Sequence, residues 1–244
     1  MSFDHCTSGH LHAGDPHGKV TEVSGWSTYV TGPESKVAIL YVTDVFGYKF
    51  RNNQLVADGL ASLASATVYI PDFLEGSYAT PEQLATGTFD LNHFLSFNVK
   101  TKRFPQILKV AQDLKKKYAK VFAVGYCWGA WACAMLAAEQ ELLSGIAMYH
   151  PSLLELPKDL ENLVVPTLIG VSVIDGQFPR ESREIAENVF EEKTKKEKLP
   201  VKLIIYPGTA HGFAIRADPN DAISSLAAKQ AMEEIAQFFK MFTE

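Results

Sequence analysis

The sequence predicts an α/β fold in which a mostly parallel, doubly wound sheet is flanked by helices. Short apolar runs rich in β-branched residues recur from about residue 36 onward. Such runs are typical of strands buried on both faces of a parallel sheet. Helical patterns separate them, and this alternation favours a parallel sheet. A chain of 244 residues suits one large α/β domain better than two, so we expect a single domain over 1–244.

The individual elements follow from the period of the apolar residues. Six segments are predicted to be buried strands: 37–43, 66–70, 121–126, 145–149, 167–173 and 201–206. Three longer segments have the apolar spacing of amphipathic helices, with their charged residues on the opposite face. These segments are 104–118, 180–196 and 222–242.

Two regions depart from this alternation. Residues 1–30 are rich in glycine and histidine and end in a predicted edge hairpin at about 20–30. Residues 73–103 contain glycine, proline and several phenylalanines between a predicted strand and a predicted helix. An insertion of that composition is a candidate lid over a site.

Composition and charge exclude several classes of partner. Lysine and arginine number 23 against 28 acidic residues, a net charge of −5, which argues against nucleic acid binding. No apolar run reaches the roughly 20 residues of a membrane helix, so we expect no membrane partner. Three cysteines and an N-terminus without signal-peptide features predict a cytoplasmic protein. The oligomeric state is not indicated.

The sharpest local motif is G-Y-C-W-G at 125–129, which lies between a predicted strand and an apolar helix. It matches the G-x-S-x-G nucleophile elbow with Cys127 in the place of serine. The elbow needs glycines because the strand turns sharply into the helix and side chains there would collide. At the N-terminus of that helix, free N–H groups favour a thiolate and an oxyanion. The alternative is a buried cysteine in a tight turn.

Two further residues extend this motif to a candidate triad. Asp175 and His211 each follow a predicted strand, where open α/β sheets place their sites. The chain order of nucleophile, acid and base is that of α/β hydrolases. Taken alone, Asp175 could be a turn former and His211 a capping or core histidine. The three in this order favour nucleophilic acyl transfer.

The remaining histidines carry weaker signals. His150 follows a predicted strand and either faces the site or has a structural role before Pro151. Four histidines cluster in the N-terminal segment without a cysteine pair or an acidic cluster nearby, so we predict no metal site. They are His5, His10, His12 and His17.

Four segments together resemble the dienelactone hydrolase family, the carboxymethylenebutenolidases and their eukaryotic relatives. They are V-T-D-V-F-G at 42–47, G-Y-C-W-G-A at 125–130, I-D-G-Q-F-P around Asp175 and A-H-G-F at 210–213. H-x-G-x-P-x-G at 12–18 and T-Y-V-T-G at 28–32 are similar to the fungal branch. The resemblance implies an α/β-hydrolase fold and hydrolysis of an ester or lactone without a cofactor. Cys127 would then be the nucleophile, His211 the general base and acid, and Asp175 the residue that orients His211.

The resemblance also assigns further positions. The backbone N–H groups of Trp128 and Val45 would form the oxyanion hole. Asp44 occupies the position of a family glutamate that contacts the resting thiol, and it is one methylene shorter. The family's arginine for the substrate carboxylate corresponds to Ile215, and Arg216 next to it is the candidate to bind an anionic substrate. The remaining candidates are Phe46, Trp128 and Phe213 as apolar walls, and Lys100, Lys102 and Arg103, by location only, as a second cation for the substrate.

We therefore predict a hydrolase that cleaves a small ester or lactone through a Cys-His-Asp triad and a thioester acyl-enzyme. One alternative is a general carboxylesterase or thioesterase without dienelactone activity. Another is a catalytically silent scaffold used for ligand sensing, since a fold does not determine a function. A redox role for Cys127 is the weakest alternative, because Cys133 is expected well inside the following helix.

Overall fold

The structure, a computed structural model, describes residues 9–243, without the side chains of Pro81, Leu84 and Ala85. His5 lies outside the described residues. Within them an eight-stranded sheet has the order β1-β2-β4-β3-β5-β6-β7-β8. The strands β3 to β8 pair in parallel, and β2 pairs antiparallel with both β1 and β4. The predicted mostly parallel, doubly wound sheet is confirmed.

The strand bounds lie close to the predicted ones. They are β1 Lys19–Val23, β2 Trp26–Thr31, β3 Val37–Val42, β4 Thr67–Pro71, β5 Lys120–Tyr126, β6 Gly145–Tyr149, β7 Thr167–Ile174 and β8 Val201–Ala210. β8 continues four residues past its predicted end, through Pro207 and Gly208. A proline is tolerated there because β8 is the last strand of the sheet and its outer side has no ladder partner in the described chain.

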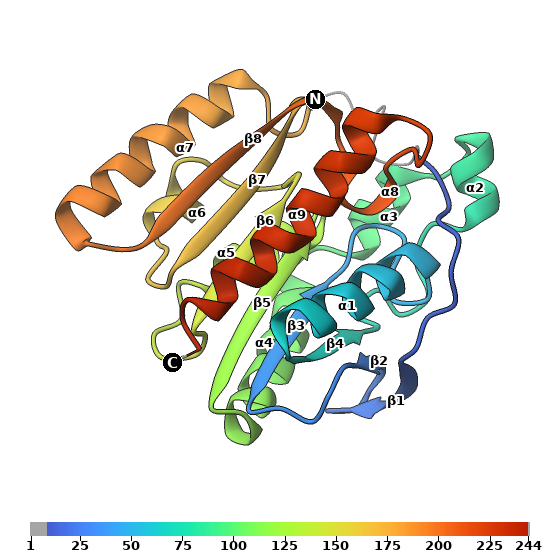
Figure 1. The fold of residues 1–244 in the computed structure, drawn as a ribbon, viewed down its shortest axis with the longest axis horizontal. Helices are drawn as coiled ribbons and strands as arrows, with labels where there is room; N and C mark the ends of the chain where they lie inside the picture. Colours follow the sequence, from blue (N-terminus) through green and yellow to red (C-terminus); the bar gives the residue numbers. More distant parts are fainter. Residues whose placement is uncertain (1–8, 244) are drawn as a thin grey trace.

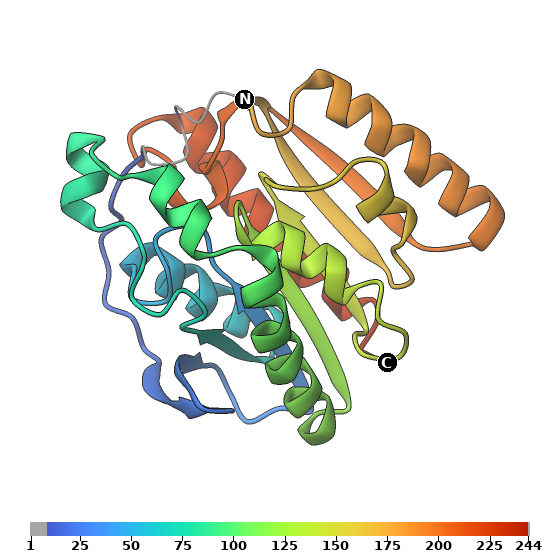
Figure 2. The same cartoon turned by 180° about the vertical axis from the view of Figure 1, so that it is seen from behind.

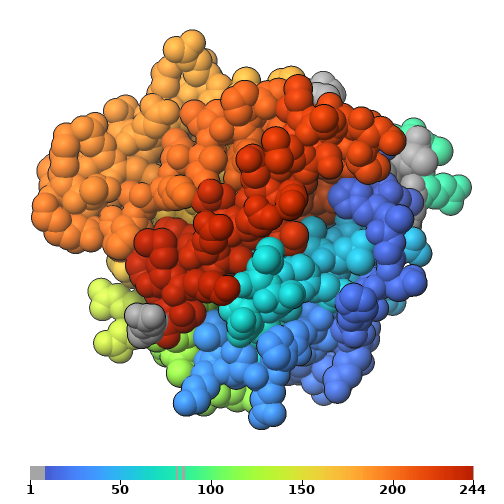
Figure 3. Space-filling model, viewed as in Figure 1, coloured from blue at the N-terminus to red at the C-terminus, as the bar shows by residue number. Residues whose placement is uncertain are grey.

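Helices cover both faces of the sheet. α1 (Arg51–Ala64) and α9 (Ala222–Lys240) lie together on one face (Figure 1), and α4 (Lys100–Lys117) and α5 (Gly129–Leu136) cover the other (Figure 2). The space-filling view shows α9 and α1 side by side with the N-terminal segment along their edge (Figure 3). The remaining helices are α2 Pro81–Thr86, α3 Leu91–Phe97, α6 Lys158–Glu161, α7 Arg180–Glu192 with a π-helical turn at Lys193–Glu197, and α8 Phe213–Arg216.

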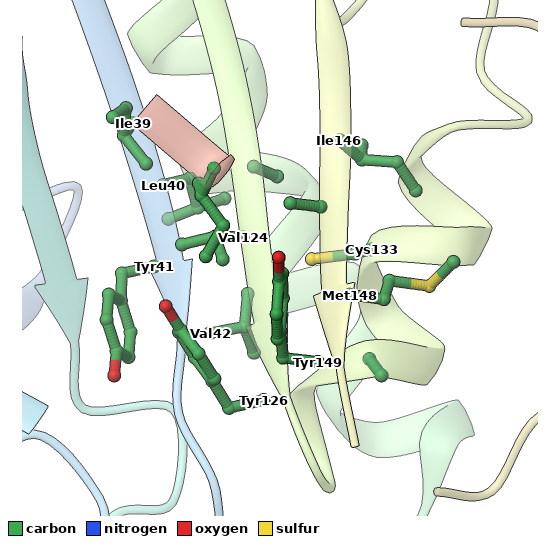
Figure 4. Close-up of a cluster of buried hydrophobic side chains, with 14 of the residues drawn as sticks. Ile39, Leu40, Tyr41, Val42, Val124, Tyr126, Cys133, Ile146, Met148 and Tyr149 are labelled. Atoms are coloured by element: carbon green, nitrogen blue, oxygen red, sulfur yellow. The ribbon is translucent and has the colours of Figure 1, made fainter. Parts of the chain in front are cut away.

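The central strands are buried on both sides, which explains their continuous apolar sequences. Figure 4 shows this packing around β3, β5 and β6, where three tyrosines gather on one side of the sheet and Cys133 lies on the other. Tyr126 packs against Tyr41 with ring centroids 4.8 Å apart and against Tyr149 at 6.2 Å. The core therefore reaches the ends of the strands that carry the candidate site.

The buried Asn52 side chain, at the start of α1, connects segments that are distant in the sequence. The side-chain oxygen of Asn52 accepts the N–H of His12 at 2.9 Å. Its amide donates to the carbonyls of His10 and Ile215 at 2.8 and 2.9 Å. The first described residues are thereby joined to α1 and α8.

The segment 73–103 contains α2, α3 and the first turn of α4. α2 begins with a capping box, in which Thr80 and Gln83 each bond the other's backbone N–H. Phe94 of α3 is buried edge-on against Trp128, with ring centroids 6.1 Å apart. The segment therefore packs directly on the elbow, and its role as a lid stays a prediction.

Candidate active site

The ladder between β5 and β6 brings two of the predicted residues together. Tyr126 and Tyr149 are the last paired residues of these parallel strands, so Cys127 and His150 follow them side by side. The N–H of Cys127 donates to the carbonyl of Tyr149 at 3.1 Å. Both side chains therefore lie at the carboxyl edge of the sheet, where α/β folds bind their ligands.

The ladder between β7 and β8 likewise brings Asp175 and His211 together. A register shift after Ser172 lets Ile174 pair with the end of β8, and the N–H of His211 donates to the carbonyl of Ile174 at 3.2 Å. Asp175 is buried and its Oδ2 accepts from Nδ1 of His211 at 2.9 Å and from the Ser172 hydroxyl at 3.1 Å. Its Oδ1 accepts the N–H of Gln177 at 2.8 Å. Three donors therefore fix this carboxylate against the imidazole.

The strand-to-helix turn has the geometry of a nucleophile elbow. Cys127 has a φ of 50°, which is strained for any residue other than glycine. A Cβ on Gly125 would lie 2.5 Å from the carbonyl oxygen of Gly129, and a Cβ on Gly129 would lie 2.1 Å from the carbonyl oxygen of Val42. Both glycines are required because backbones approach too closely for a side chain.

The charge state of His211 reflects competing influences. Burial alone would lower the pKa of the ring, but the charge of the Cys127 sulfur and the hydrogen bond with Asp175 outweigh it and raise the pKa to about 9. A hydrogen bond with the Cys127 side chain also contributes to raising this pKa. Because Asp175 holds Nδ1, Nε2 is the ring nitrogen left to interact with the sulfur.

The two backbone groups predicted for an oxyanion hole flank this turn. Trp128 directly precedes α5, and Val45 lies in the loop after β3, where its carbonyl accepts the N–H of Ala79 at 2.9 Å. Neither N–H donates to another described residue. Both donors are thus available to a ligand oxygen.

Asp44 and Arg216 form a fully buried ion pair next to the site. Arg216 donates from Nη1 to Oδ2 of Asp44, and its guanidinium lies 4.8 Å from the centre of the Phe46 ring. Oδ1 of Asp44 accepts from Asn53 Nδ2 at 3.0 Å and from the N–H of Phe46 at 3.1 Å. A Cβ on Gly212 would lie 2.2 Å from Nη2 of Arg216, so the guanidinium passes directly over the residue after His211.

His150 is enclosed next to the acid-base pair. Its ring centre lies 5.0 Å from that of His211 and 5.8 Å from that of Phe213. Burial, together with the positive charges of His211 and Arg216, holds the pKa of His150 well below its usual value. Both of its ring nitrogens lack a hydrogen-bond partner in the described chain. The ring is therefore a neutral, unsatisfied polar group beside the site.

The apolar candidates form aromatic clusters around these residues. Phe46 stacks on Phe50 at 4.8 Å, and Phe213 packs on Tyr206 at the same distance. Trp128 packs edge-on against Trp131 at 5.4 Å. Phe46, Trp128 and Phe213 are all buried, and Phe213 also packs on His150.

The three cations considered for a substrate carboxylate bond elsewhere. Arg103 is fully buried and pairs with Glu75 at 2.6 Å and with Asn98 at 2.8 Å. Lys102 also reaches Glu75, at 3.5 Å, and Lys100 reaches Glu155 at 3.3 Å. These bonds hold the 73–103 segment and its neighbours together, and the structure does not bring them to the triad.

Ser152, which the sequence motifs do not indicate, contacts the Cys127 sulfur. Its Oγ lies 3.7 Å from Sγ of Cys127, and its N–H donates to the Cys127 carbonyl at 3.2 Å. Asn53, which holds Asp44, was also missed. The signal for Ser152 was its place two residues after His150, at the end of a predicted strand.

The described residues also bear on metal sites and membrane spans. No group of three or more His, Cys, Asp or Glu side chains within 9–243 is placed to hold a metal ion. Among the helices of that range, none is both long and apolar enough to cross a membrane.

Comparison with known proteins identifies the family. The model of the dienelactone hydrolase family matches residues 26–243. The chain belongs to this family. It is 26% identical over 242 residues to hydrolase pyvD of Aspergillus violaceofuscus, covering 97% of this chain and 95% of that one. It is 28% identical to the carboxymethylenebutenolidase homolog of Xenopus tropicalis, covering 82% and 80%.

Solved structures confirm the fold. Carboxyl esterase 2 of Tuber melanosporum superposes with a TM-score of 0.65 at 15% identity, covering 98% of this chain and 91% of that one. This likeness concerns the α/β-hydrolase fold alone. Membership of the dienelactone hydrolase family supports a hydrolase that acts on small esters or lactones.

Proposed function

We propose that this dienelactone hydrolase family member cleaves its ester or lactone through Cys127, His211 and Asp175. The observation that carries the proposal is the hydrogen bond between Asp175 and Nδ1 of His211. Because Asp175 holds Nδ1, Nε2 is the nitrogen that can exchange protons beside Cys127, whose φ is strained. We further propose a cytoplasmic location and small-molecule substrates, as the sequence predicts.

In the first half of the reaction, the Cys127 thiolate attacks the carbonyl carbon and forms a C–S bond. The carbonyl oxygen takes the negative charge and accepts the N–H groups of Trp128 and Val45. The C–O bond of the ester or lactone then breaks, and the leaving oxygen takes the proton from Nε2 of His211. A thioester and a neutral imidazole remain.

In the second half, water attacks the thioester carbonyl and gives its proton to Nε2 of His211. The tetrahedral intermediate collapses with loss of the C–S bond, which releases the acid and restores the thiolate beside a protonated His211. Asp175 keeps Nδ1 as a donor throughout, so Nε2 alone moves protons.

The test measures hydrolysis of a dienelactone and of a short-chain aryl ester by the wild type and by Cys127→Ala. We expect the variant to lose at least about a thousandfold in kcat/KM on both substrates, because the nucleophile is gone. Cys133→Ala is the matched control, since it removes a buried thiol in α5 that takes no part in the chemistry. Mass spectrometry of the acylated wild type should find the acyl group on Cys127.

The outcomes separate the alternatives. Turnover of the aryl ester alone, through Cys127, would retain the triad and identify a general esterase. Full activity of Cys127→Ala on either substrate would refute the assignment of the nucleophile.

A further inference from the structure

We propose that Ser152 is a catalytic residue whose hydroxyl donates a hydrogen bond to the Cys127 thiolate in the resting enzyme and again as the thiolate leaves the acyl-enzyme. This inference rests on the proposed role of Cys127 as the nucleophile. It adds a residue that neither the motif nor the family match assigns.

The geometry is fixed by the backbone. The N–H of Cys127 donates to the carbonyl of Tyr149, and the N–H of Ser152 donates back to the carbonyl of Cys127 at 3.2 Å. These two bonds clamp the loop after β6 to the elbow from both sides. The backbone of Ser152 is therefore held beside the elbow, and its Oγ lies 3.7 Å from Sγ of Cys127.

The surroundings make this contact chemically significant. Cys127 is 2% exposed and Ser152 is 5% exposed, so water does little to stabilise the charge on sulfur. A hydroxyl donor in such a setting favours the charged form of its acceptor. It adds to the interaction of the same sulfur with His211, which contributes to raising the pKa of that ring.

The hydroxyl acts differently on the two halves of the reaction. In the resting enzyme it stabilises the thiolate, which increases the ionised fraction but lowers the nucleophilicity of the sulfur. A thioester sulfur is a much weaker acceptor than a thiolate. As the C–S bond breaks during hydrolysis of the acyl-enzyme, charge returns to sulfur and the hydrogen bond strengthens, which assists its departure.

The experiment removes the hydroxyl with Ser152→Ala and measures the rate of Cys127 alkylation by iodoacetamide as a function of pH. The rate measured for Cys127→Ala is subtracted to remove alkylation at other sites. We expect the midpoint of the profile to move up by about one pH unit, since a hydrogen bond to a charged group is lost. The rate on the alkaline plateau should rise about threefold, because the freed thiolate is more nucleophilic. A gain in access to the sulfur alone would raise the alkylation rate at every pH and leave the midpoint where it is, so the midpoint is the deciding readout.

A kinetic readout tests the second half. With an activated aryl ester, hydrolysis of the acyl-enzyme by Ser152→Ala should slow by up to about tenfold, while the initial burst of phenol persists. Ser152→Thr retains a hydroxyl and should restore the wild-type midpoint. Thr28→Val is the control for loss of a fully buried hydroxyl, since Thr28 lies on β2 and its hydroxyl donates to the carbonyl of Trp26.

The result separates the two proposals. If Cys127 is the alkylated, essential residue and Ser152→Ala leaves the midpoint unchanged, whatever the plateau, the role of Ser152 is refuted and that of Cys127 is retained. If Cys127→Ala hydrolyses esters at the wild-type rate, the proposed function itself fails.

Discussion

Replacing Arg216 by methionine should destabilise the protein through the charge that it leaves behind. The Arg216 side chain is 1% exposed and the Asp44 side chain is 0% exposed, so the substitution leaves a carboxylate buried without its cation. Breaking a buried ion pair from one side typically costs about 3 to 5 kcal/mol. Asp44 keeps the donors Asn53 Nδ2 and Phe46 N–H, so we expect a loss near the lower end, about 3 kcal/mol.

The measurement is urea and thermal unfolding of Arg216→Met, Asp44→Asn and the double variant at neutral pH. For a chain of this length, a loss of about 3 kcal/mol corresponds to a fall in Tm of about 6 to 12 °C. Removing both charges should cost less than the sum of the single changes, because no charge is then left unpaired. The control Arg180→Met breaks the exposed i,i+4 pair with Glu184 and should change stability by at most about 0.5 kcal/mol.

Either of two results would refute this reasoning. A loss below about 1 kcal/mol for Arg216→Met would place the pair in the range of exposed salt bridges. Additivity of the two single variants in the double variant would mean that the charges are not coupled.

Three further predictions concern the proposed catalytic machinery. Because the pKa of His211 is raised to about 9, its proton is present at neutral pH and lost above that value, so kcat/KM for an aryl ester should fall on the alkaline side with a midpoint near 9. Asp175→Asn removes the acceptor of the Nδ1 proton, so kcat/KM should fall by about a thousandfold or more while Tm changes little. Gly129→Ala places a Cβ 2.1 Å from the Val42 carbonyl oxygen; the displaced turn should lower the activity of Cys127 by about a hundredfold or more, and a normal kcat would contradict the elbow geometry.

The strands were predictable because their sequences report burial directly. A strand covered on both faces has no polar side, so runs such as Val37–Val42 are continuous and apolar. The common location of the site residues was predictable as well, because the carboxyl ends of parallel strands lie at one edge of the sheet. The hydrogen bond between Asp175 and His211 also depends on the register shift between β7 and β8. Nothing in the local sequence indicates this shift, so the bond itself could not be predicted.

Helix α1 was not predicted, although it is 14 residues long. Its buried face includes Asn52 and Asn53 together with Ala57 and Leu60, so two core positions are polar and the apolar period is masked. Both asparagines are satisfied by residues distant in the sequence, Asn52 by the His10 and Ile215 carbonyls and Asn53 by Asp44 and Gly47. A buried polar side chain is acceptable when hydrogen-bonded, but its partners become known only in three dimensions.

Arg216 illustrates why the positions of the triad candidates were easier to predict than the direction of a substrate-binding side chain. A shift of one residue along a helix turns a side chain by about 100°, so the guanidinium cannot be assumed to lie where the family has its arginine at the position of Ile215. In the structure Arg216 turns back over Gly212 to Asp44 and Phe46. Arg216 is already neutralised by the buried carboxylate of Asp44. A substrate carboxylate that bound Arg216 in place of Asp44 would leave the Asp44 charge buried without a partner, at a cost in desolvation. The triad depends on backbone turns and strand register, which the motifs encode, whereas recognition depends on side chains whose direction a one-residue shift can change.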